Sequence, residues 1–262
     1  MDDLGTPHLR FERRGPVGWC IVDRPEARNA LTSVMYLGVR RAVDLVNRDA
    51  DLAALVITGT GDVFIPGGEM GGRHDDDPAG LAALFGTDVL PFRAIRHSAA
   101  PVVAAVNGLC QGGGLIIAAL SDVTVASERA TFRAPEALRG VADANLAAIL
   151  PAHVGLAYAR DMLMTGRRLD AREAERVGLI ARVAAHDELA DEATRAAREL
   201  LQAAPDARFQ SKRMINARYG LVDDMTFERS VFSAETREGF QAFVDKRTPA
   251  WVPEEFRTGG RL

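Results

Sequence analysis

The sequence predicts an α/β core followed by a helical C-terminal appendage. Up to about residue 140, short apolar runs of strand length alternate with segments whose apolar residues recur at helical spacing. Beyond residue 140 the pattern becomes mainly helical. The length of 262 residues, 47% of them hydrophobic and 26% charged, suits one large domain with an appendage or two small domains. Strands interleaved with helices, and then helices alone, indicate this architecture.

Turn signals and apolar spacing predict the elements of the first half. Residues 9–13 and 17–22 flank Gly15-Pro16 and predict a β-hairpin. Residues 32–47 predict a helix with Thr32 or Ser33 as its N-cap. The other expected elements are buried strands at 52–58 and 102–106, helices at 88–97 and 115–120, and short strands at 122–126 and 130–133.

The second half is expected to hold one strand among several helices. The helices are predicted at 144–150, 156–163, 171–177, 188–203 and about 226–243, and the strand at 178–183. The last helix is amphipathic.

Composition excludes several classes of protein. A net charge of -4 without a basic block makes nucleic acid a poor partner. Residues 1–7 are too short and polar for a signal peptide, and no apolar run approaches the ~20 residues that cross a bilayer. We therefore expect no membrane partner and a cytoplasmic location. Cys20 and Cys110 are expected in the core rather than in a disulfide or metal site, and the His74 to Asp77 run is expected to be solvated.

Two glycine-rich segments are candidates for ligand binding. Gly67 and Gly68 follow an apolar strand, and Gly112 to Gly114 open a helix. Glycines at a helix start expose unpaired N–H donors and the positive end of the helix dipole. Two such donors aimed at one carbonyl oxygen form an oxyanion hole, worth ~3–4 kcal/mol for each donor. The alternative is that the glycines only permit tight turns. No nucleotide-phosphate motif is present.

Taken together, these segments resemble the enoyl-CoA hydratase/isomerase (crotonase) family over almost the whole chain. The matching stretches, in the family's order, are 23–31, 64–70, 101–114, 132–140, 163–168, 177–179 and 238–247. The resemblance implies a crotonase-like spiral of β-β-α units at residues 1–200, which holds CoA and the active site. It implies a helical trimerisation region at residues 201–262, with a homotrimer or dimer of trimers. The substrate would be an acyl-CoA thioester, with no separate cofactor or metal ion.

The resemblance also assigns CoA-binding residues. Gly68 and Gly113 would supply the oxyanion N–H groups, and main-chain groups from Gly67 to Met70 would meet the adenine and the pantetheine arm. The turn at Ala27 and Arg28 would hold the CoA nucleotide. Lys246 would reach the CoA phosphate, unless it is only a solvated helix end, and Phe243 would lie at a subunit interface or in the acyl pocket.

The acid/base residues decide between two reactions. Family hydratases carry two glutamates, one following Phe-x-x-Pro and one three residues beyond the oxyanion glycine. This sequence has Glu136 at the former position and Ile116 at the latter. Hydration needs one group to activate water and one to deliver a proton, whereas a double-bond shift needs a single carboxylate. Ile116 therefore favours isomerisation, and it predicts a drier site with a raised pKa for Glu136.

Asp143 leaves the assignment open. It is either a second acid/base group or the N-cap of the helix that begins at Ala144. The leading hypothesis is an enoyl-CoA isomerase that uses Glu136; the alternative is a hydratase in which Asp143 replaces the missing acid or Glu136 performs both steps. An acyl-CoA hydrolase or decarboxylase is a further hypothesis, since an oxyanion hole suits either reaction. The last hypothesis is a binding protein without catalytic activity, which the presence of Glu136 disfavours.

Overall fold

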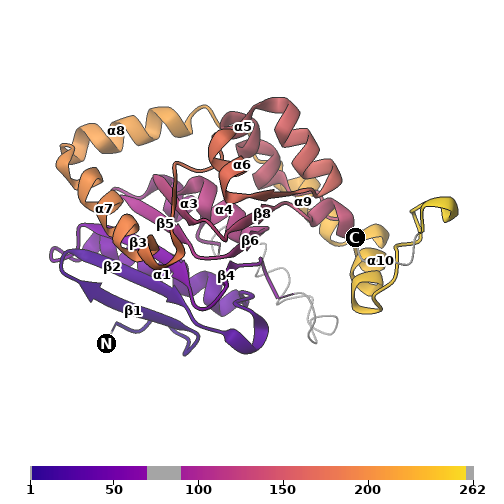
Figure 1. Ribbon diagram of the computed structural model, residues 1–262, viewed down its shortest axis with the longest axis horizontal. Helices are drawn as coiled ribbons and strands as arrows, with labels where there is room; N and C mark the ends of the chain where they lie inside the picture. Colours follow the sequence, from indigo (N-terminus) through magenta and orange to yellow (C-terminus); the bar gives the residue numbers. More distant parts are fainter. Residues whose placement is uncertain (1, 70–89, 258–262) are drawn as a thin grey trace.

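The computed structural model describes residues 2–69 and 90–257, and its strands form two sheets (Figure 1). The six-stranded sheet has the order β1-β2-β3-β5-β7-β10 and the four-stranded sheet β4-β6-β8-β9. The strands are β1 (Leu9–Arg14), β2 (Val17–Val22), β3 (Ala54–Gly59), β4 (Val63–Ile65), β5 (Val102–Val106), β6 (Leu109–Gln111), β7 (Val123–Ser127), β8 (Thr131–Arg133), β9 (Arg168–Asp170) and β10 (Arg182–Ala184).

The helices lie between and after these strands. They are α1 (Ser33–Arg48), α3 (Phe92–His97), α4 (Gly113–Leu120), α5 (Ala144–Thr165), α6 (Ala171–Arg176), α7 (Leu189–Gln202), α8 (Pro205–Asn216), α9 (Asp224–Val231) and α10 (Ala234–Val244). The described residues also form short 3-10 helices, η1 (Pro25–Ala27), η3 (Glu136–Arg139), η4 (His186–Glu188) and η5 (Glu254–Phe256).

Three β-β-α units repeat along the chain: β3–β4–α3, β5–β6–α4 and β7–β8–α5. In each unit the first strand joins the six-stranded sheet and the second joins the four-stranded sheet. Strands β3, β5 and β7 pair in parallel, as do β4, β6 and β8. The chain therefore advances by one strand in each sheet per unit, which confirms the predicted spiral.

Both faces of the six-stranded sheet are covered by apolar side chains. Ala54 and Val56 on β3 belong to the cluster under α7, whereas Leu55 and Ile57 belong to the main core with α1, α3 and α4. The side chains that α7 contributes are Leu189, Ala193, Ala196 and Ala197. Because alternate residues face two apolar layers, the strand is a continuous apolar run, as predicted.

Several predicted elements are confirmed closely. Strands β1 and β2 form the antiparallel hairpin. Thr32 is the N-cap of α1, where its side-chain oxygen accepts from the N–H of Met35 at 3.3 Å. Strand β5 has the bounds expected for it.

Helix boundaries differ most from the predictions. The helix predicted at 226–243 is two helices, because Ser233 caps a new helix by accepting from the N–H of Thr236 at 3.0 Å. The helices predicted at 144–150 and 156–163 carry the single label α5, but Gly155, with φ 73° and ψ 164°, interrupts the helical backbone between them, so the predicted division is confirmed. The helix predicted at 88–97 begins only at Phe92, after Pro91; residues 88 and 89 lie outside the described residues.

The sequence also gave no signal for four elements. Strands β4, β6 and β9 are three residues long, which is too short for a readable alternation, and α8 was not predicted. The strand expected at 178–183 is confined to β10, Arg182–Ala184.

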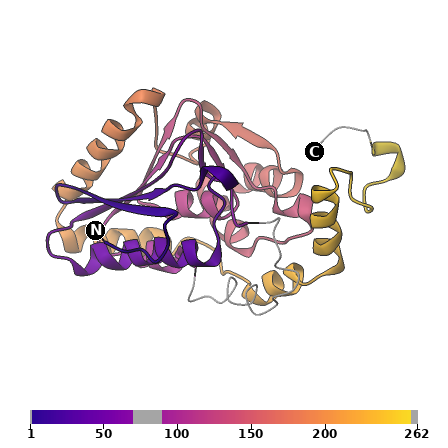
Figure 2. The same cartoon turned by 90° about the horizontal axis from the view of Figure 1, so that it is seen from below.

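Helix α10 lies at the end of the molecule opposite the β1–β2 hairpin (Figure 2). It packs against η3, where a Cβ at Gly239 would lie 2.5 Å from the carbonyl of Arg139. Large apolar side chains are exposed on α8 to α10 and around them: Met214, Ile215, Leu221, Met225, Phe232, Phe243 and Val244. The homotrimer or dimer of trimers stays a prediction. Among the described residues no helix is long and apolar enough to span a bilayer.

A buried ion pair fastens α8 to the sheet. The Lys212 ammonium donates to Asp122 Oδ2 at 2.8 Å, and the same oxygen accepts from the N–H of Val102 at 2.8 Å. Burial lowers the pKa of Lys212, although the nearby Asp122 opposes this shift. The pair therefore holds α8 against the start of β5.

Replacing Lys212 by Ala is expected to lower the free energy of unfolding by about 3 kcal/mol, because it leaves the Asp122 carboxylate buried without its cation. Urea denaturation measures the change. The control is Lys246→Ala, which removes the other lysine from an exposed position and should change stability by less than about 0.5 kcal/mol. Equal effects of the two substitutions would contradict a stabilising role for the pair.

Candidate active site

The site lies at one edge of the four-stranded sheet. Strands β4, β6 and β8 are parallel neighbours. Within three residues of their carboxyl ends come Gly67-Gly68, Gly112-Gly113 and Glu136 respectively. Since the carboxyl ends of parallel strands meet at one edge, three short connections converge there.

The first glycine turn is held by a bridge to Leu31. The N–H of Leu31 donates to Gly67 O at 3.0 Å, and the N–H of Glu69 donates to Leu31 O at 2.9 Å. These two bonds flank Gly68 and use neither of its own backbone groups. The N–H of Gly68 is therefore left for another acceptor.

The second glycine turn lies directly against the first. A Cβ on Gly67 would be 3.8 Å from the Gly113 nitrogen. Gly113 is the first residue of α4, so its N–H has no intrahelical acceptor. Across residues 2–69 and 90–257, neither the Gly68 N–H nor the Gly113 N–H meets an acceptor. The two glycine turns are therefore in contact, as an oxyanion hole requires; that the Gly68 and Gly113 N–H groups form one stays a prediction.

Glu136 begins η3 and faces the second glycine turn. Its Oε1 lies so close to Gly112 that a Cβ there would collide with it. Gly112 also has φ 50° and ψ -123°, a conformation that side chains rarely adopt. Glycine at this position therefore lets the carboxyl group approach the backbone N–H groups.

The Glu136 carboxyl group is poorly solvated. The residue as a whole is partly exposed, but Oε2 is buried and has no hydrogen-bond partner among the described residues. Burial raises the pKa of Glu136, and the negative charge of Asp143 raises it further, whereas Arg139 and Arg133 lower it. Ile116, on the first turn of α4, is only 3% exposed. The raised pKa agrees with the dry site that the sequence predicts.

Asp143 is both a helix cap and a neighbour of Glu136. Its Oδ1 accepts from the N–H of Leu146 at 2.8 Å, which confirms it as the N-cap of α5. Burial also raises the pKa of Asp143, and its charge acts on Glu136. Two carboxyl groups that interact in this way titrate as a pair.

Tyr36 is a site residue that the sequence did not reveal. It lies on α1 and is 5% exposed, and its hydroxyl is 3.7 Å from the position of a Cβ on Gly68. A Cβ on Gly113 would collide with the same hydroxyl. In the sequence Tyr36 looks like any other residue of a buried helical stripe, so no local signal distinguishes it.

The turn expected to hold the CoA nucleotide is tied to the first glycine turn. Ala27 ends η1, and Arg28 is exposed with φ 50°. Nearby, Arg24 donates to Glu69 Oε1 at 3.0 Å, and Asn29 Nδ2 donates to Val63 O at 2.7 Å. The first contact joins the chain around the Ala27–Arg28 turn to the segment from Gly67 to Met70, and the second joins it to β4, the strand before that segment.

For three other residues predicted to bind CoA, no contact among the described residues joins them to the glycine turns. Met70 lies outside the described residues. Phe243 is 55% exposed on α10, with the Arg139 guanidinium 4.7 Å from its ring centre. Lys246 is exposed just beyond α10 with φ 56°, and no ion pair joins it to the described residues. Their roles stay predictions.

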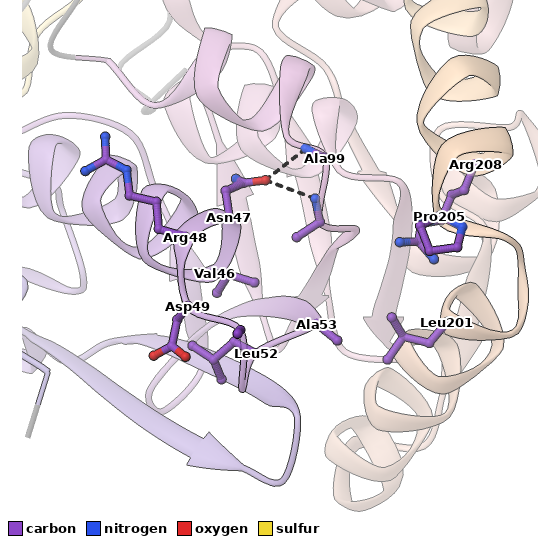
Figure 3. A pocket seen from close by; sticks show the side chains of 12 residues that line it. Val46, Asn47, Arg48, Asp49, Leu52, Ala53, Ala99, Leu201, Pro205 and Arg208 are labelled. Carbon is purple, nitrogen blue, oxygen red and sulfur yellow. Dashed lines mark hydrogen bonds between the residues drawn. The ribbon is translucent and has the colours of Figure 1, made fainter.

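A hollow on the surface lies away from the candidate active site, and the polar contacts in it hold a turn in place. It lies between the end of α1 and the start of α8 (Figure 3). Asn47 Oδ1 accepts there from the N–H groups of Ala99 and Ala100 at 2.9 and 3.0 Å, which fixes the turn before β5. The charged residues that line this hollow are Asp49, Arg48 and Arg208. Neither Glu136 nor Asp143 lines it, so the hollow is separate from the candidate active site.

Comparison with known proteins identifies the family. The family model for enoyl-CoA hydratase/isomerase matches residues 13–254, so this chain belongs to that family. The "Probable enoyl-CoA hydratase, mitochondrial" of Dictyostelium discoideum is 31% identical over 92% of this chain and 89% of that protein. The "Probable enoyl-CoA hydratase" of Rhizobium meliloti is 34% identical over 91% of this chain and 95% of that protein.

A solved structure agrees with this assignment. The enoyl-CoA hydratase/isomerase from Pseudoalteromonas atlantica has a TM-score of 0.80 and 30% identity to this chain, over 94% of this chain and 100% of that one. The crotonase fold predicted from the sequence is therefore confirmed.

Replacing Glu136 by Gln is expected to stabilise the protein near pH 8 but not near pH 4. Its carboxyl has a raised pKa in the folded state, so on raising the pH the unfolded chain loses this proton first, near its ordinary pKa of 4.5. The wild type therefore loses stability as the pH rises towards the folded pKa, whereas the amide does not titrate. Denaturation at both pH values should show a gain of roughly 2 kcal/mol only at the higher one.

The exposed Glu128→Gln serves as the control for this comparison. A pH-independent difference between Glu136→Gln and the wild type would mean that Glu136 is not perturbed.

Proposed function

We propose that this enzyme catalyses the reversible hydration of a 2-enoyl-CoA thioester. Two findings support hydration over the isomerisation that Ile116 suggests: the similar proteins named enoyl-CoA hydratase, and a second carboxyl group at the site. One observation carries the proposal. The Glu136 carboxyl group lies against Gly112, beside the turn that carries the Gly113 N–H, and the negative charge of Asp143 acts on it, while the Gly68 and Gly113 N–H groups meet no acceptor among the described residues.

The N–H groups of Gly68 and Gly113 would hold the thioester carbonyl oxygen. Donating to this oxygen draws electrons from the conjugated C2=C3 bond and makes C3 electrophilic. As water adds to C3, negative charge moves to the oxygen, where the two fixed donors stabilise it most. The chain thus favours the enolate-like transition state over the substrate.

The carboxyl pair would manage the two protons. Because ionising one group raises the pKa of the other, the pair holds a single proton over a range of pH. The ionised member takes a proton from water as its oxygen bonds to C3, and the protonated member gives its proton to C2. The product is a 3-hydroxyacyl-CoA, and the pair again carries one proton.

Double-bond isomerisation is the second candidate. It is favoured by Ile116, which is buried where family hydratases have a glutamate. In this reaction Glu136 alone would take a proton at C2 of a 3-enoyl-CoA and return it at C4, with the same N–H groups holding the dienolate oxygen.

Supplying 2-enoyl-CoA and 3-enoyl-CoA separately distinguishes these reactions. We expect rapid loss of the 2-enoyl absorbance through hydration and a slower double-bond shift. Glu136→Gln should lower kcat by about 10³-fold without weakening CoA binding, while the exposed Glu128→Gln should behave like the wild type. Rapid isomerisation without hydration would overturn the proposal in favour of the second candidate.

Replacing Asp143 by Asn separates its two roles. Asn caps helices as well as Asp does, so stability should be retained if capping is unchanged. We expect kcat for hydration to fall by about 10²-fold. The pKa of Glu136 should also fall, because the negative charge of Asp143 that raises it is gone. The part of the kcat/KM pH profile that reports the ionisation of Glu136 should therefore move to lower pH.

The matched control is Asp170→Asn, which changes the N-cap of α6 away from the glycine turns. If Asp143→Asn and Asp170→Asn both keep wild-type rates and pH profiles, Asp143 is only a cap and Glu136 acts alone.

A further inference from the structure

The hydroxyl of Tyr36 lacks a partner that buried tyrosines normally have. The chain contains three tyrosines. Tyr158 donates to Glu173 Oε1 at 3.4 Å, and the Tyr219 hydroxyl pairs with His153 Nε2 at 3.1 Å. The Tyr36 side chain is more deeply buried than either of them, yet its hydroxyl has no hydrogen bond to any described residue. The oxygen itself keeps some contact with solvent, so a bound molecule can reach it and become the partner that a largely buried tyrosine normally has.

That hydroxyl lies close to both Gly68 and Gly113, whose N–H groups meet no acceptor among the described residues. It is 3.7 Å from the Cβ position of Gly68, an ordinary contact distance, and it would collide with a Cβ on Gly113. Position 113 therefore needs glycine if Tyr36 is to reach this point. A group bound to the two N–H donors would lie beside the phenol oxygen.

The ring of Tyr36 is held in place by its surroundings. It makes an edge-to-face contact with Phe92 on α3, with ring centres 6.2 Å apart and an angle of 82° between the planes. The rest of the side chain belongs to the main core with Met35 and Val39. The hydroxyl is thus fixed before a ligand arrives, as a donor must be if it is to stabilise a developing charge.

The phenol remains protonated under working conditions. Burial raises the pKa of Tyr36, and the negative charges of Glu136 and Asp143 raise it further. Tyr36 therefore presents an O–H donor rather than a phenolate.

We propose that Tyr36 is a third hydrogen-bond donor to the thioester oxygen, beside the N–H groups of Gly68 and Gly113. This rests on the proposed acyl-CoA chemistry of the same site. An O–H donor strengthens as negative charge builds on its acceptor, so Tyr36 stabilises the enolate more than the substrate. It is a catalytic residue because it touches the reacting carbonyl group.

The test compares Tyr36→Phe with Tyr158→Phe, which removes a hydroxyl outside the site. We expect Tyr36→Phe to lower kcat by about 10- to 100-fold with KM within about threefold, and Tyr158→Phe to leave both unchanged. A bound enoyl-CoA with a conjugated aryl chromophore reports carbonyl polarisation by a red shift of its absorption. That shift should be smaller in Tyr36→Phe, which a purely structural role would not cause.

A second measurement tests the proposal without the Tyr36→Phe variant, in case that variant does not fold. Incorporating 3-fluorotyrosine gives three ¹⁹F signals, and Tyr158→Phe and Tyr219→Phe assign the third to Tyr36 by elimination. The Tyr36 signal should move on binding the chromophoric enoyl-CoA but not on binding CoA alone.

Two outcomes overturn the assignment of Tyr36: a wild-type kcat and red shift in folded Tyr36→Phe, or a ¹⁹F signal that does not respond to the thioester. Failure of the proposed function looks different. In that case the wild type itself would neither turn over enoyl-CoA nor shift the absorption of the bound chromophore.

Discussion

The site depends on the close approach of two stretches of backbone. Strands β4 and β6 are parallel neighbours, so the turns after them must pass each other within van der Waals contact. A Cβ on Gly67 would be 3.8 Å from the Gly113 nitrogen, and a Cβ on Gly114 would lie 2.7 Å from Cβ of Ile65. Glycine satisfies this constraint, and the N–H groups of Gly68 and Gly113 lie on the two turns that it brings into contact. Strand β8 then adds Glu136 at the same edge.

The sequence predicted the long elements and the glycine and carboxyl positions, but not how they converge. The apolar run at 52–58 and the Thr32 cap were sufficient for β3 and α1. Of the three strands that lead into the site, β8 was predicted, whereas β4 and β6 are only three residues long and their alternation could not be read. Tyr36 was missed because its contact with Gly113, 77 positions along the chain, is tertiary and leaves no local pattern.

The C-terminal helices are part of the site's framework. The break at Ser233 lets α10 pack on η3, where Thr236 Oγ1 donates to Gly140 O at 2.9 Å. In α9, Ser230 Oγ accepts from the N–H of Ala142 at 3.1 Å. These contacts hold the segment between Glu136 and Asp143 from outside. A single helix through residue 233, as expected from amphipathic spacing, would not provide this arrangement.

In the proposed mechanism the thioester oxygen is held by two peptide N–H groups and the Tyr36 hydroxyl, whereas the protons are handled by carboxyl side chains. On this proposal, a substitution at position 116 or 143 would change which carbon gains or loses a proton without altering the main-chain donors. Ile116 is a buried residue on the first turn of α4. An acidic side chain could replace it there without a change in the path of the backbone. The proposed mechanism therefore separates activation of the thioester from choice of reaction, so that single substitutions at the carboxyl positions would change the reaction while the main-chain donors stay.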